Sequence, residues 1–381
     1  MDFGFFHELL SIDSTSGKER KVALWLAERL PGMFPEANRP ALRVDEVGDG
    51  TLNLLLTWGA PRIVFCTHVD TVPPYIPPSV IPGSTSPVIP GSISSVIQGL
   101  TRNLPEVILG RGACDAKGQV FAMVTACQKL AEQGSTDFGL LLLAGEETGS
   151  WGAKAFAKTE FKAEYLVVGE PTDNCMVSAS KGTKSFDLKF KGIPFHSGYP
   201  QYGVSAVDLF VEFVNALKAK DFGTDPLLGE TTWNIGLVHS DNPQNILSPE
   251  LTCRLYFRTT FVSDEAVSAW MAKAPEGEAV PGAFARIGSR SDAEGTASPS
   301  GHITVTPRGG DTPARYWTVE GLPAKSVAFG SDAPHLKNFT HKAICGPGSI
   351  TVAHRDDEQI RVADLATAVE QYLALYRAAT K

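Results

Sequence analysis

The sequence of 381 residues lacks the features that mark membrane proteins and nucleic-acid-binding proteins. No apolar run reaches the roughly 18 residues that a membrane-spanning helix requires, so we expect no membrane partner. Acidic residues outnumber basic residues by 42 to 34, which gives a net charge of -8. Since non-specific binding to nucleic acid needs a basic surface, this balance argues against a nucleic-acid partner.

Cysteine pairs and a basic amino terminus are missing as well. The six cysteines are scattered and form no Cys-x-x-Cys motif. The first ten residues carry Asp2 and Glu8 and no lysine or arginine, unlike a secretory signal. Dispersed cysteines in a chain without such a signal are typical of reduced thiols, so we expect a cytoplasmic protein.

Charged residues are also absent from one long internal segment, residues 71–101, which is rich in Pro, Gly, Ser and Ile. Similar short motifs recur in it every eight residues: Val80-Ile81-Pro82-Gly83-Ser84, Val88-Ile89-Pro90-Gly91-Ser92 and Val96-Ile97-Gln98-Gly99. Three copies are too few for a solenoid. We interpret the segment as an irregular excursion of the chain, with a flap that contacts the substrate or a second subunit as the alternative.

What the sequence does contain is an alternation of apolar strands and helical stretches. We expect strands at 52–57, 63–68, 138–144 and 165–168, and a helix at 116–133. This order predicts an α/β fold with a mostly parallel sheet flanked by helices.

A different order of elements begins near residue 177. Strands at 186–190, 232–238, 251–258 and 284–287 alternate with helices at 204–219 and 264–273. The order β-α-β-β-α-β predicts an inserted α+β domain of the ferredoxin-like type. We therefore divide the chain into a first part at 1–176, an inserted domain at 177–292, and a second part at 293–381.

Polar residues stand where open α/β sheets place their chemistry, at the carboxyl ends of strands. His68 ends one expected strand and Asp70 follows it, a spacing that suits a metal-bound imidazole oriented by a carboxylate. Taken alone, an ordinary histidine at a strand end is the alternative. Asp115 directly precedes a helix, where a carboxylate also serves as an N-cap. The Gly110-Arg111-Gly112 motif lacks the third glycine of a dinucleotide-binding loop.

Glu146 and Glu147 are adjacent acids at the end of an apolar strand, and Glu170 follows the next strand. Adjacent carboxylates repel each other and lose hydration on burial, unless cations offset their charge. Together with His68 and with His354 late in the chain, they favour a divalent-metal site. Mixed histidine and carboxylate ligands suit zinc, manganese or cobalt.

Seven motifs of this kind span nearly the whole chain, and their order is that of a known family. In them the chain resembles the co-catalytic zinc metallopeptidases and deacylases, a family that includes acetylornithine deacetylase, succinyl-diaminopimelate desuccinylase, carboxypeptidase G and the aminoacylases. Within that family, Gly346-Pro347-Gly348-Ser349-Ile350 is most similar to acetylornithine deacetylases. The seven motifs are His68-Val69-Asp70-Thr71-Val72-Pro73, Gly110 to Gly118, Glu146-Glu147, Gly169-Glu170-Pro171-Thr172, Phe195-His196-Ser197, Asn245-Ile246-Leu247-Ser248-Pro249 and Ala353 to Glu358.

The resemblance implies a site for two divalent metal ions, with zinc as the first expectation and cobalt or manganese as alternatives. His68 and Glu170 would hold one ion, Glu147 and His354 would hold the other, and Asp115 would bridge both. The resemblance also implies that the parts at 1–176 and 293–381 form the catalytic, metal-binding domain and that the inserted domain is a lid and dimerisation domain.

The resemblance also implies three catalytic residues. Asp70 would orient His68 through its second ring nitrogen. Glu146 would be the general base, taking a proton from a metal-bridging water and delivering it to the leaving amine. His196 of the inserted domain would donate to the oxyanion, often from the other subunit of a homodimer formed through that domain.

Substrate binding is implied for three further residues. Asn245 and Arg258 would grip the substrate, Arg258 through its α-carboxylate, and Gly348 would supply backbone contacts. We interpret the remaining histidines as surface or structural residues. His335, in Gly330-Ser331-Asp332-Ala333-Pro334-His335, falls where the family has its substrate loop.

The resemblance thus implies an enzyme that removes an acetyl or succinyl group from an amino acid such as N-acetylornithine or N-acetylcitrulline, in arginine biosynthesis. A dipeptidase or carboxypeptidase of the same family is the alternative. Ser178-Ala179-Ser180-Lys181 fits the Ser-x-x-Lys motif of some serine hydrolases, but their other motifs are absent. A metal-free binding protein would leave the adjacent acids unexplained.

Overall fold

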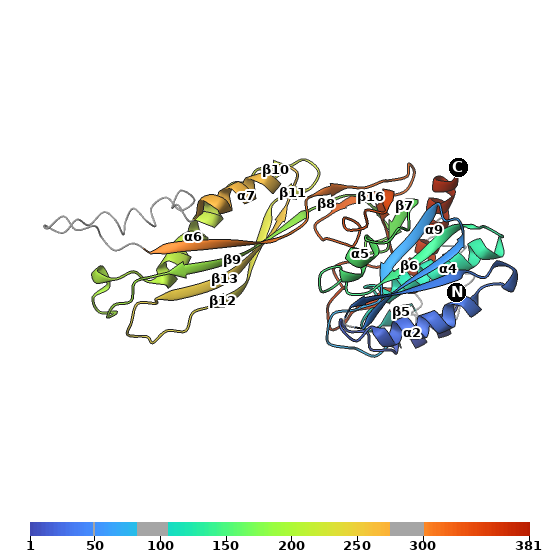
Figure 1. Cartoon of the computed structure of the whole chain (residues 1–381), viewed down its shortest axis with the longest axis horizontal. Coiled ribbons are helices and arrows are strands. Elements are labelled where there is room, and N and C mark those ends of the chain that lie inside the picture. The colour runs from blue at the N-terminus through green and yellow to red at the C-terminus, as the bar shows by residue number, and fades with distance from the viewer. Residues whose placement is uncertain (49, 82–105, 275–300) are drawn as a thin grey trace. The chain divides into compact units, whose positions relative to one another are not determined.

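The computed structural model describes residues 1–48, 50–81, 106–274 and 301–381 (Figure 1). They form two compact units. The first unit comprises Met1–Ser178, Tyr316–Lys325 and Ser331–Lys381, and the second comprises Ala179–Arg315 and Ser326–Gly330. Most of the uncharged segment, residues 82–101, and the strand expected at 284–287 lie outside the described residues. Among the described residues, no helix is both long enough and apolar enough to cross a membrane.

A six-stranded sheet forms the centre of the first unit, in the order β1-β2-β6-β3-β7-β17. Neighbours in the series β6-β3-β7-β17 are parallel, whereas β1 and β2 are antiparallel additions at one edge. The predicted α/β fold with a mostly parallel sheet is therefore confirmed. The strands are β1 (Ala41–Gly48), β2 (Thr51–Gly59), β3 (Ile63–His68), β6 (Asp137–Leu143), β7 (Ala163–Val168) and β17 (Phe339–Ile344).

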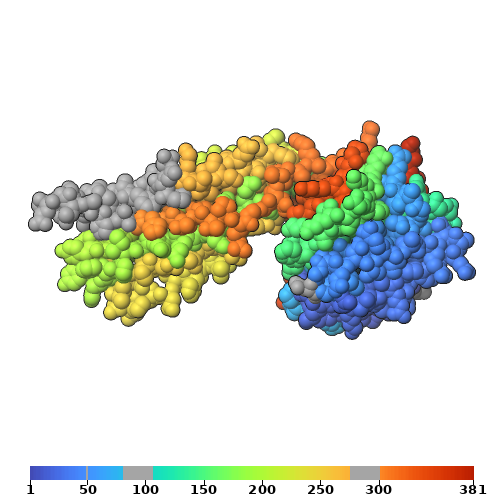
Figure 2. Space-filling view, in the orientation of Figure 1, coloured from blue at the N-terminus to red at the C-terminus, as the bar shows by residue number. Residues whose placement is uncertain are grey.

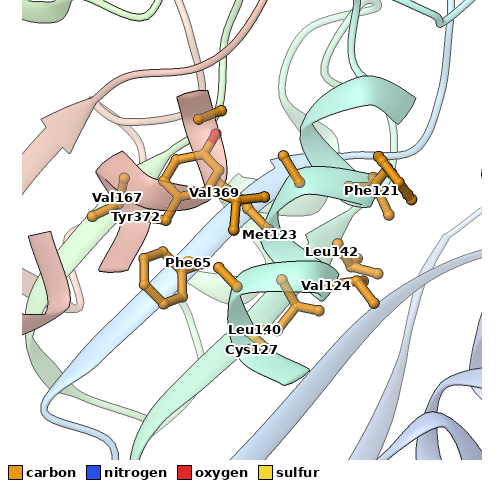
Figure 3. Packing of buried hydrophobic residues seen from close by; sticks show 14 of the residues in the cluster. Phe65, Phe121, Met123, Val124, Cys127, Leu140, Leu142, Val167, Val369 and Tyr372 are labelled. Carbon is orange, nitrogen blue, oxygen red and sulfur yellow. The ribbon is translucent and has the colours of Figure 1, made fainter. Parts of the chain in front are cut away.

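Four helices share a hydrophobic core with one face of this sheet. Phe65 of β3 faces Tyr372 of the last helix, with ring centroids 5.6 Å apart, and Leu140 of β6 packs in the same cluster (Figure 3). Because side chains alternate along a strand, the intervening residues face the opposite side, where Asn53 donates to the Gly152 carbonyl at 2.9 Å. The helices of the core are α1 (Phe3–Leu10), α2 (Arg20–Arg29), α4 (Lys117–Glu132) and α9 (Val362–Thr380), and Gly152 belongs to α5 (Trp151–Phe156).

Short elements surround this core, and the N-terminal part of the chain, blue in Figure 2, forms a continuous part of the surface of the first unit. One three-stranded sheet of this unit has the order β18-β5-β4, whereas a second, β15-β8-β16, includes β15 and parts of β8 and β16 that belong to the second unit. Their strands are β4 (Ser79–Ile81), β5 (Val107–Leu109), β18 (Gln359–Arg361), β8 (Met176–Ser180), β15 (Ala314–Arg315) and β16 (Ala324–Val327). The short 3-10 helices are η1 (Leu30–Met33), η2 (Glu36–Asn38) and, in the second unit, η3 (Pro200–Tyr202).

The second unit contains a separate antiparallel sheet in the order β12-β13-β9-β14. Phe186, Leu188 and Phe190 on one face of this sheet pack with Leu209 and Phe213 of α6 in a second core. Among the described residues, the main elements follow the order β-α-β-β-α-β, as the ferredoxin-like prediction requires. The elements are β9 (Gly182–Lys191), α6 (Ala206–Ala219), β12 (Thr232–His239), β13 (Glu250–Thr259), α7 (Asp264–Lys273) and β14 (His302–Gly309), with the short pair β10 (Thr224–Asp225) and β11 (Gly229–Glu230).

The limits of the second unit differ from the predicted boundaries of the inserted domain, 177 and 292. The strand β14 lies after residue 292 and pairs with β9 from His302 opposite Lys191 onward. This pairing extends to Gly309, and the chain stays in the second unit as far as Arg315. The apolar and polar residues of His302-Ile303-Thr304-Val305-Thr306 alternate as in a strand with one buried face, a signal that the sequence-based division overlooked.

Candidate active site

The carboxyl ends of three neighbouring strands bring acidic residues and a histidine together in the first unit. β3 ends at His68, Glu146 and Glu147 follow β6, and Glu170 follows β7. β6, β3 and β7 are parallel neighbours, so their carboxyl ends meet at one edge of the sheet. Asp115, just before α4, completes a cluster around this edge.

One group of possible metal ligands consists of His68, Asp115 and Glu170, all of them buried. One ligand atom of each lies within 4.8 Å of the others, and Nε2 of His68 is 3.1 Å from Oδ1 of Asp115. Oε1 of Glu170 is buried without a hydrogen-bond partner among the described residues. Burial raises the pKa of Glu170 well above its usual value. An unpaired buried carboxylate oxygen is costly, and coordination to a cation would satisfy it.

A second group consists of Asp115, Glu147 and His354. Nε2 of His354 is 3.0 Å from Oε1 of Glu147 and 3.3 Å from Oδ2 of Asp115. Hydrogen bonds to Asp115 and Glu147 raise the pKa of His354 to about 10. His354 differs from His68 in two respects, because its side chain is 48% exposed and its backbone has a left-handed φ of 64°.

Asp115 is common to both groups and turns one carboxylate oxygen to each histidine. Oδ1 faces His68 and Oδ2 faces His354. Burial raises the pKa of Asp115, but the hydrogen bonds from His354 and His68 outweigh burial and leave the pKa below its usual value. A carboxylate with this arrangement is suited to bridge two cations.

Glu146 lies beside both groups, and with His68 and Glu147 it forms a third set of ligand atoms within 4.8 Å of one another. Burial and the charges of Asp332 and Glu147 raise its pKa well above the usual value, although His68 opposes the shift. A carboxyl group with a raised pKa next to possible cation ligands is suited to accept and return a proton near neutral pH.

Asp70 supports the site in more ways than the sequence indicates. Nδ1 of His68 is 2.9 Å from the backbone oxygen of Asp70 and 3.4 Å from its carboxylate oxygen Oδ1. The Asp70 carboxylate also accepts the backbone N–H groups of Glu146 at 3.0 Å and Glu147 at 3.2 Å, and the Ser16 hydroxyl at 2.8 Å. Asp70 therefore fixes the imidazole of His68 and the loop that carries both glutamates.

The donor atoms in these groups fit two divalent cations. Each group contains one imidazole nitrogen and carboxylate oxygens, and Asp115 belongs to both. Histidine and carboxylate ligands suit zinc, cobalt or manganese. The unpartnered oxygen of Glu170 lies in the group with His68 and provides a further acceptor for a cation.

Gly348, predicted to contact the substrate, has a structural reason to be glycine. Its φ is 79°, and a Cβ atom there would lie 2.6 Å from Sγ of Cys114 and 2.7 Å from Cδ1 of Ile360. The glycine thus lets the loop after β17 pack closely against the residue that precedes Asp115. Its role in substrate binding stays a prediction.

The other predicted residues belong to the second unit, which brings only two of them together. The segments of His196 and Asn245 are neighbours, because Ser197 donates its N–H to the Asn245 carbonyl at 2.9 Å. Arg258 pairs with Thr183, near the start of β9, whereas the His196 segment follows the end of β9 at Lys191. With about 3.3 Å per strand residue, Arg258 and His196 lie at opposite ends of this sheet.

Sequence reasoning missed Asp332 in the first unit. This aspartate is 1% exposed, and its Oδ1 has no hydrogen-bond partner among the described residues. Burial raises its pKa to about 6, while a hydrogen bond with Ser150 opposes the shift. Its charge contributes to the raised pKa of Glu146 and of Glu170, so it lies close to the cluster. The sequence signal for Asp332 is an acid among small residues, three positions before His335.

Comparisons with known proteins agree with this geometry. The sequence pattern of peptidase family M20/M25/M40 matches residues 64–378. A protein of Aspergillus oryzae named a probable carboxypeptidase is 30% identical over 405 residues, which cover 98% of this chain and 86% of the relative.

Two solved structures show the same fold over nearly the whole chain. A tripeptidase of Staphylococcus aureus has a TM-score of 0.74 at 19% identity and covers 99% of this chain and 97% of its own. An M20 family metallo-carboxypeptidase of Sulfolobus solfataricus has a TM-score of 0.63 at 17% identity and covers 99% of each chain. At these identities the likeness concerns the fold alone.

Proposed function

The chain belongs to peptidase family M20/M25/M40, and from this membership we propose that it is a metal-dependent carboxypeptidase acting on short peptides. The observation that carries the proposal is the position of Asp115 between two groups of histidine and carboxylate ligands, with Glu146 beside both. Such a site is suited to hydrolyse an amide bond. The names of the similar proteins support a peptide as the substrate.

This proposal corrects the main prediction from the sequence. The sequence favoured an N-acyl-amino-acid deacylase of arginine biosynthesis, whereas the named relatives support the alternative, a peptidase. The metal-site motifs are shared by both kinds of enzyme and do not separate them. The motif that pointed to acetylornithine deacetylases contains Gly348, for which close packing against Cys114 is sufficient explanation.

In the proposed site His68 and Glu170 would hold one cation, Glu147 and His354 would hold the other, and Asp115 would contact both. When bound, a pair of divalent cations, for which we propose zinc, would polarise the scissile carbonyl and lower the pKa of the attacking water.

The protein's own groups would guide the proton. Glu146 would accept a proton from the attacking water and return it to the leaving amine, and its raised pKa suits both transfers. Asp70 would keep Glu146 in place through the hydrogen bond to its backbone N–H. We also propose that His196 donates to the oxyanion, that Asn245 and Arg258 hold the substrate, and that the second unit forms a homodimer.

A substrate panel tests the proposed peptidase activity. The protein is freed of metal, reloaded with Zn²⁺, and assayed with three series that share the same carboxyl-terminal residues. The series are N-blocked dipeptides, the same dipeptides with an amidated carboxyl terminus, and N-acetyl amino acids that include N-acetylornithine. We expect the highest kcat/KM for the dipeptides with a free carboxylate and at least about a tenfold loss on amidation, since a charged contact is lost.

Three outcomes would contradict the proposal. A preference for N-acetylornithine over every peptide would restore the deacylase prediction. Activity that survives a chelator would favour a serine hydrolase. A protein that retains no zinc after gel filtration, measured by elemental analysis, would point to a metal-free binding protein instead.

A further inference from the structure

Glu358 is a buried carboxylate that contacts the backbone of the Asp115 loop. It is 1% exposed. Its Oε1 accepts the backbone N–H groups of Gly112, Cys114 and Asp115, each at 3.0 Å. Three converging N–H groups at one anionic oxygen are charge-assisted hydrogen bonds, which are shorter and stronger than neutral ones. The conformation of the loop immediately before Asp115 therefore depends on this one side chain.

The second oxygen of Glu358 forms a buried ion pair with Arg111. Nη1 of Arg111 is 2.6 Å from Oε2 of Glu358, and both side chains are fully buried. Nε of Arg111 donates to the Pro74 carbonyl at 3.1 Å, and its backbone N–H donates to the Ile76 carbonyl at 3.0 Å. The pair thus ties together the segment after Asp70, the Asp115 loop and the segment that ends at Glu358.

The two groups of possible ligands depend on these contacts to different degrees. His68 and Glu170 lie at or just after the ends of β3 and β7, which the central sheet fixes. His354 lies four residues before Glu358, in a stretch without regular strands, and its side chain is half-exposed. Glu358 consequently anchors both Asp115 and the segment that carries His354. Two of the three possible ligands in the group with His354 therefore depend on Glu358.

We propose that Glu358, held by Arg111, is a positioning residue that sets the binding of the cation at Asp115, Glu147 and His354. It directs one oxygen of Asp115 toward His354 and fixes the end of the segment that carries His354. Cation binding at His68, Asp115 and Glu170 depends on it less. This inference rests on the proposed two-cation site.

The test uses Glu358→Gln in the full chain. The variant keeps the size of the side chain, but an amide must point its NH₂ group either at the backbone donors or at Arg111, which offers only donors. The metal-free wild type and the variant are titrated with Co²⁺, with calorimetry and the visible absorption of the bound ion as readouts. We expect two equivalents in the wild type, and in the variant a second site weakened about 10–100-fold, the usual effect of removing a group that supports a metal ligand.

A matched control is Asp357→Asn, the same change of acid to amide one residue earlier. Asp357 is exposed and pairs with Arg355, so both cation affinities should equal those of the wild type. Excess Co²⁺ should restore much of the kcat of Glu358→Gln, because the second site refills. A loss of thermal stability alone, with both cation affinities unchanged, would show a merely structural role and overturn the inference.

A second variant covers the case in which Glu358→Gln does not fold. Arg111→Lys keeps the positive charge and loses the donor to Pro74, so it should weaken the same second site to a smaller degree. Wild-type affinities in Arg111→Lys would overturn the inference. If the wild type itself binds no cation, the proposed function fails. If the wild type binds two cations and both variants bind them as tightly as the wild type does, only the proposed role of Glu358 and Arg111 fails.

Discussion

The two histidines of the candidate site stand in opposite surroundings. His68 ends a central strand, is 1% exposed and has hydrogen-bond partners at both ring nitrogens. His354 lies in a loop, has a 48% exposed side chain and a left-handed backbone. The central sheet therefore fixes the position of His68. Side-chain contacts, such as that of Glu358 with the Asp115 loop, hold the group of possible ligands that contains His354.

The largest effect is expected at Glu146, which lies beside both groups of possible metal ligands. Glu146→Gln should lower kcat at least about 10³-fold while both cations stay bound, because a positioned general base is lost but the ligands remain. Glu36→Gln, at an exposed position, is the control and should be neutral. Turnover near that of the wild type would rule out Glu146 as the base, and loss of a cation would mean that it is a ligand.

The stability of the metal-free protein should separate the two histidines directly. His68→Ala leaves buried partners at Asp70 and Asp115 unsatisfied and should lower the free energy of unfolding by about 3 kcal/mol. His354→Ala also removes a hydrogen-bond partner of Asp115 and Glu147, but its half-exposed position admits water to them, so it should cost less, about 1 kcal/mol. Urea unfolding measures both values. Equal losses of unfolding free energy would contradict the view that the sheet fixes His68 more firmly than the loop fixes His354.

Removal of the metal should lower both the activity and the stability of the protein, because both groups of possible ligands lose their cations. A chelator should abolish activity, and Zn²⁺ should restore it. Zinc at about 100 times its dissociation constant should add about 2.7 kcal/mol to the free energy of unfolding for each independent site. Thermal melts at increasing Zn²⁺ measure this gain. A melting temperature that does not respond to zinc would be inconsistent with a folded-state metal site.

The smallest expected difference, about 2 kcal/mol between two glycine variants, concerns the packing of the loop that carries Gly348. The φ of Gly348 is left-handed, and an added Cβ there would lie 2.6 Å from Sγ of Cys114. Gly321 also has a left-handed φ, 87°, but an added Cβ there would meet nothing within 4 Å. Both variants should lose roughly 1–2 kcal/mol through the backbone. Gly348→Ala should lose a further 2 kcal/mol or so through overpacking. Equal unfolding free energies would show that the loop yields to the extra atom.

The sequence predicts the sheet and its cluster of acids because both rest on local patterns. Apolar strands ending in His68, Glu146 and Glu170 are visible along the chain, and parallel strands bring their ends to one edge. A helix that starts just after Asp115 is equally visible. These features need no knowledge of distant contacts.

The remaining features depend on contacts between residues far apart in the chain. Arg111 and Glu358 are 247 positions apart, and nothing in either local sequence indicates an ion pair. The support that Asp70 gives to the Glu146 and Glu147 backbone joins segments 76 and 77 positions apart. The position of Arg258 at one end of its sheet follows from strand register, which hydrophobic alternation does not assign when several pairings bury the same face.

The shared carboxylate of Asp115 has a thermodynamic consequence for any pair of ions at this site. A cation beside His68 and a cation beside His354 would share this one carboxylate, because its Oδ1 faces His68 and its Oδ2 faces His354. The two affinities would therefore be linked, and linkage requires that each cation change the affinity for the other by the same factor. Occupancy at the exposed His354 would thus report what is bound at the buried His68.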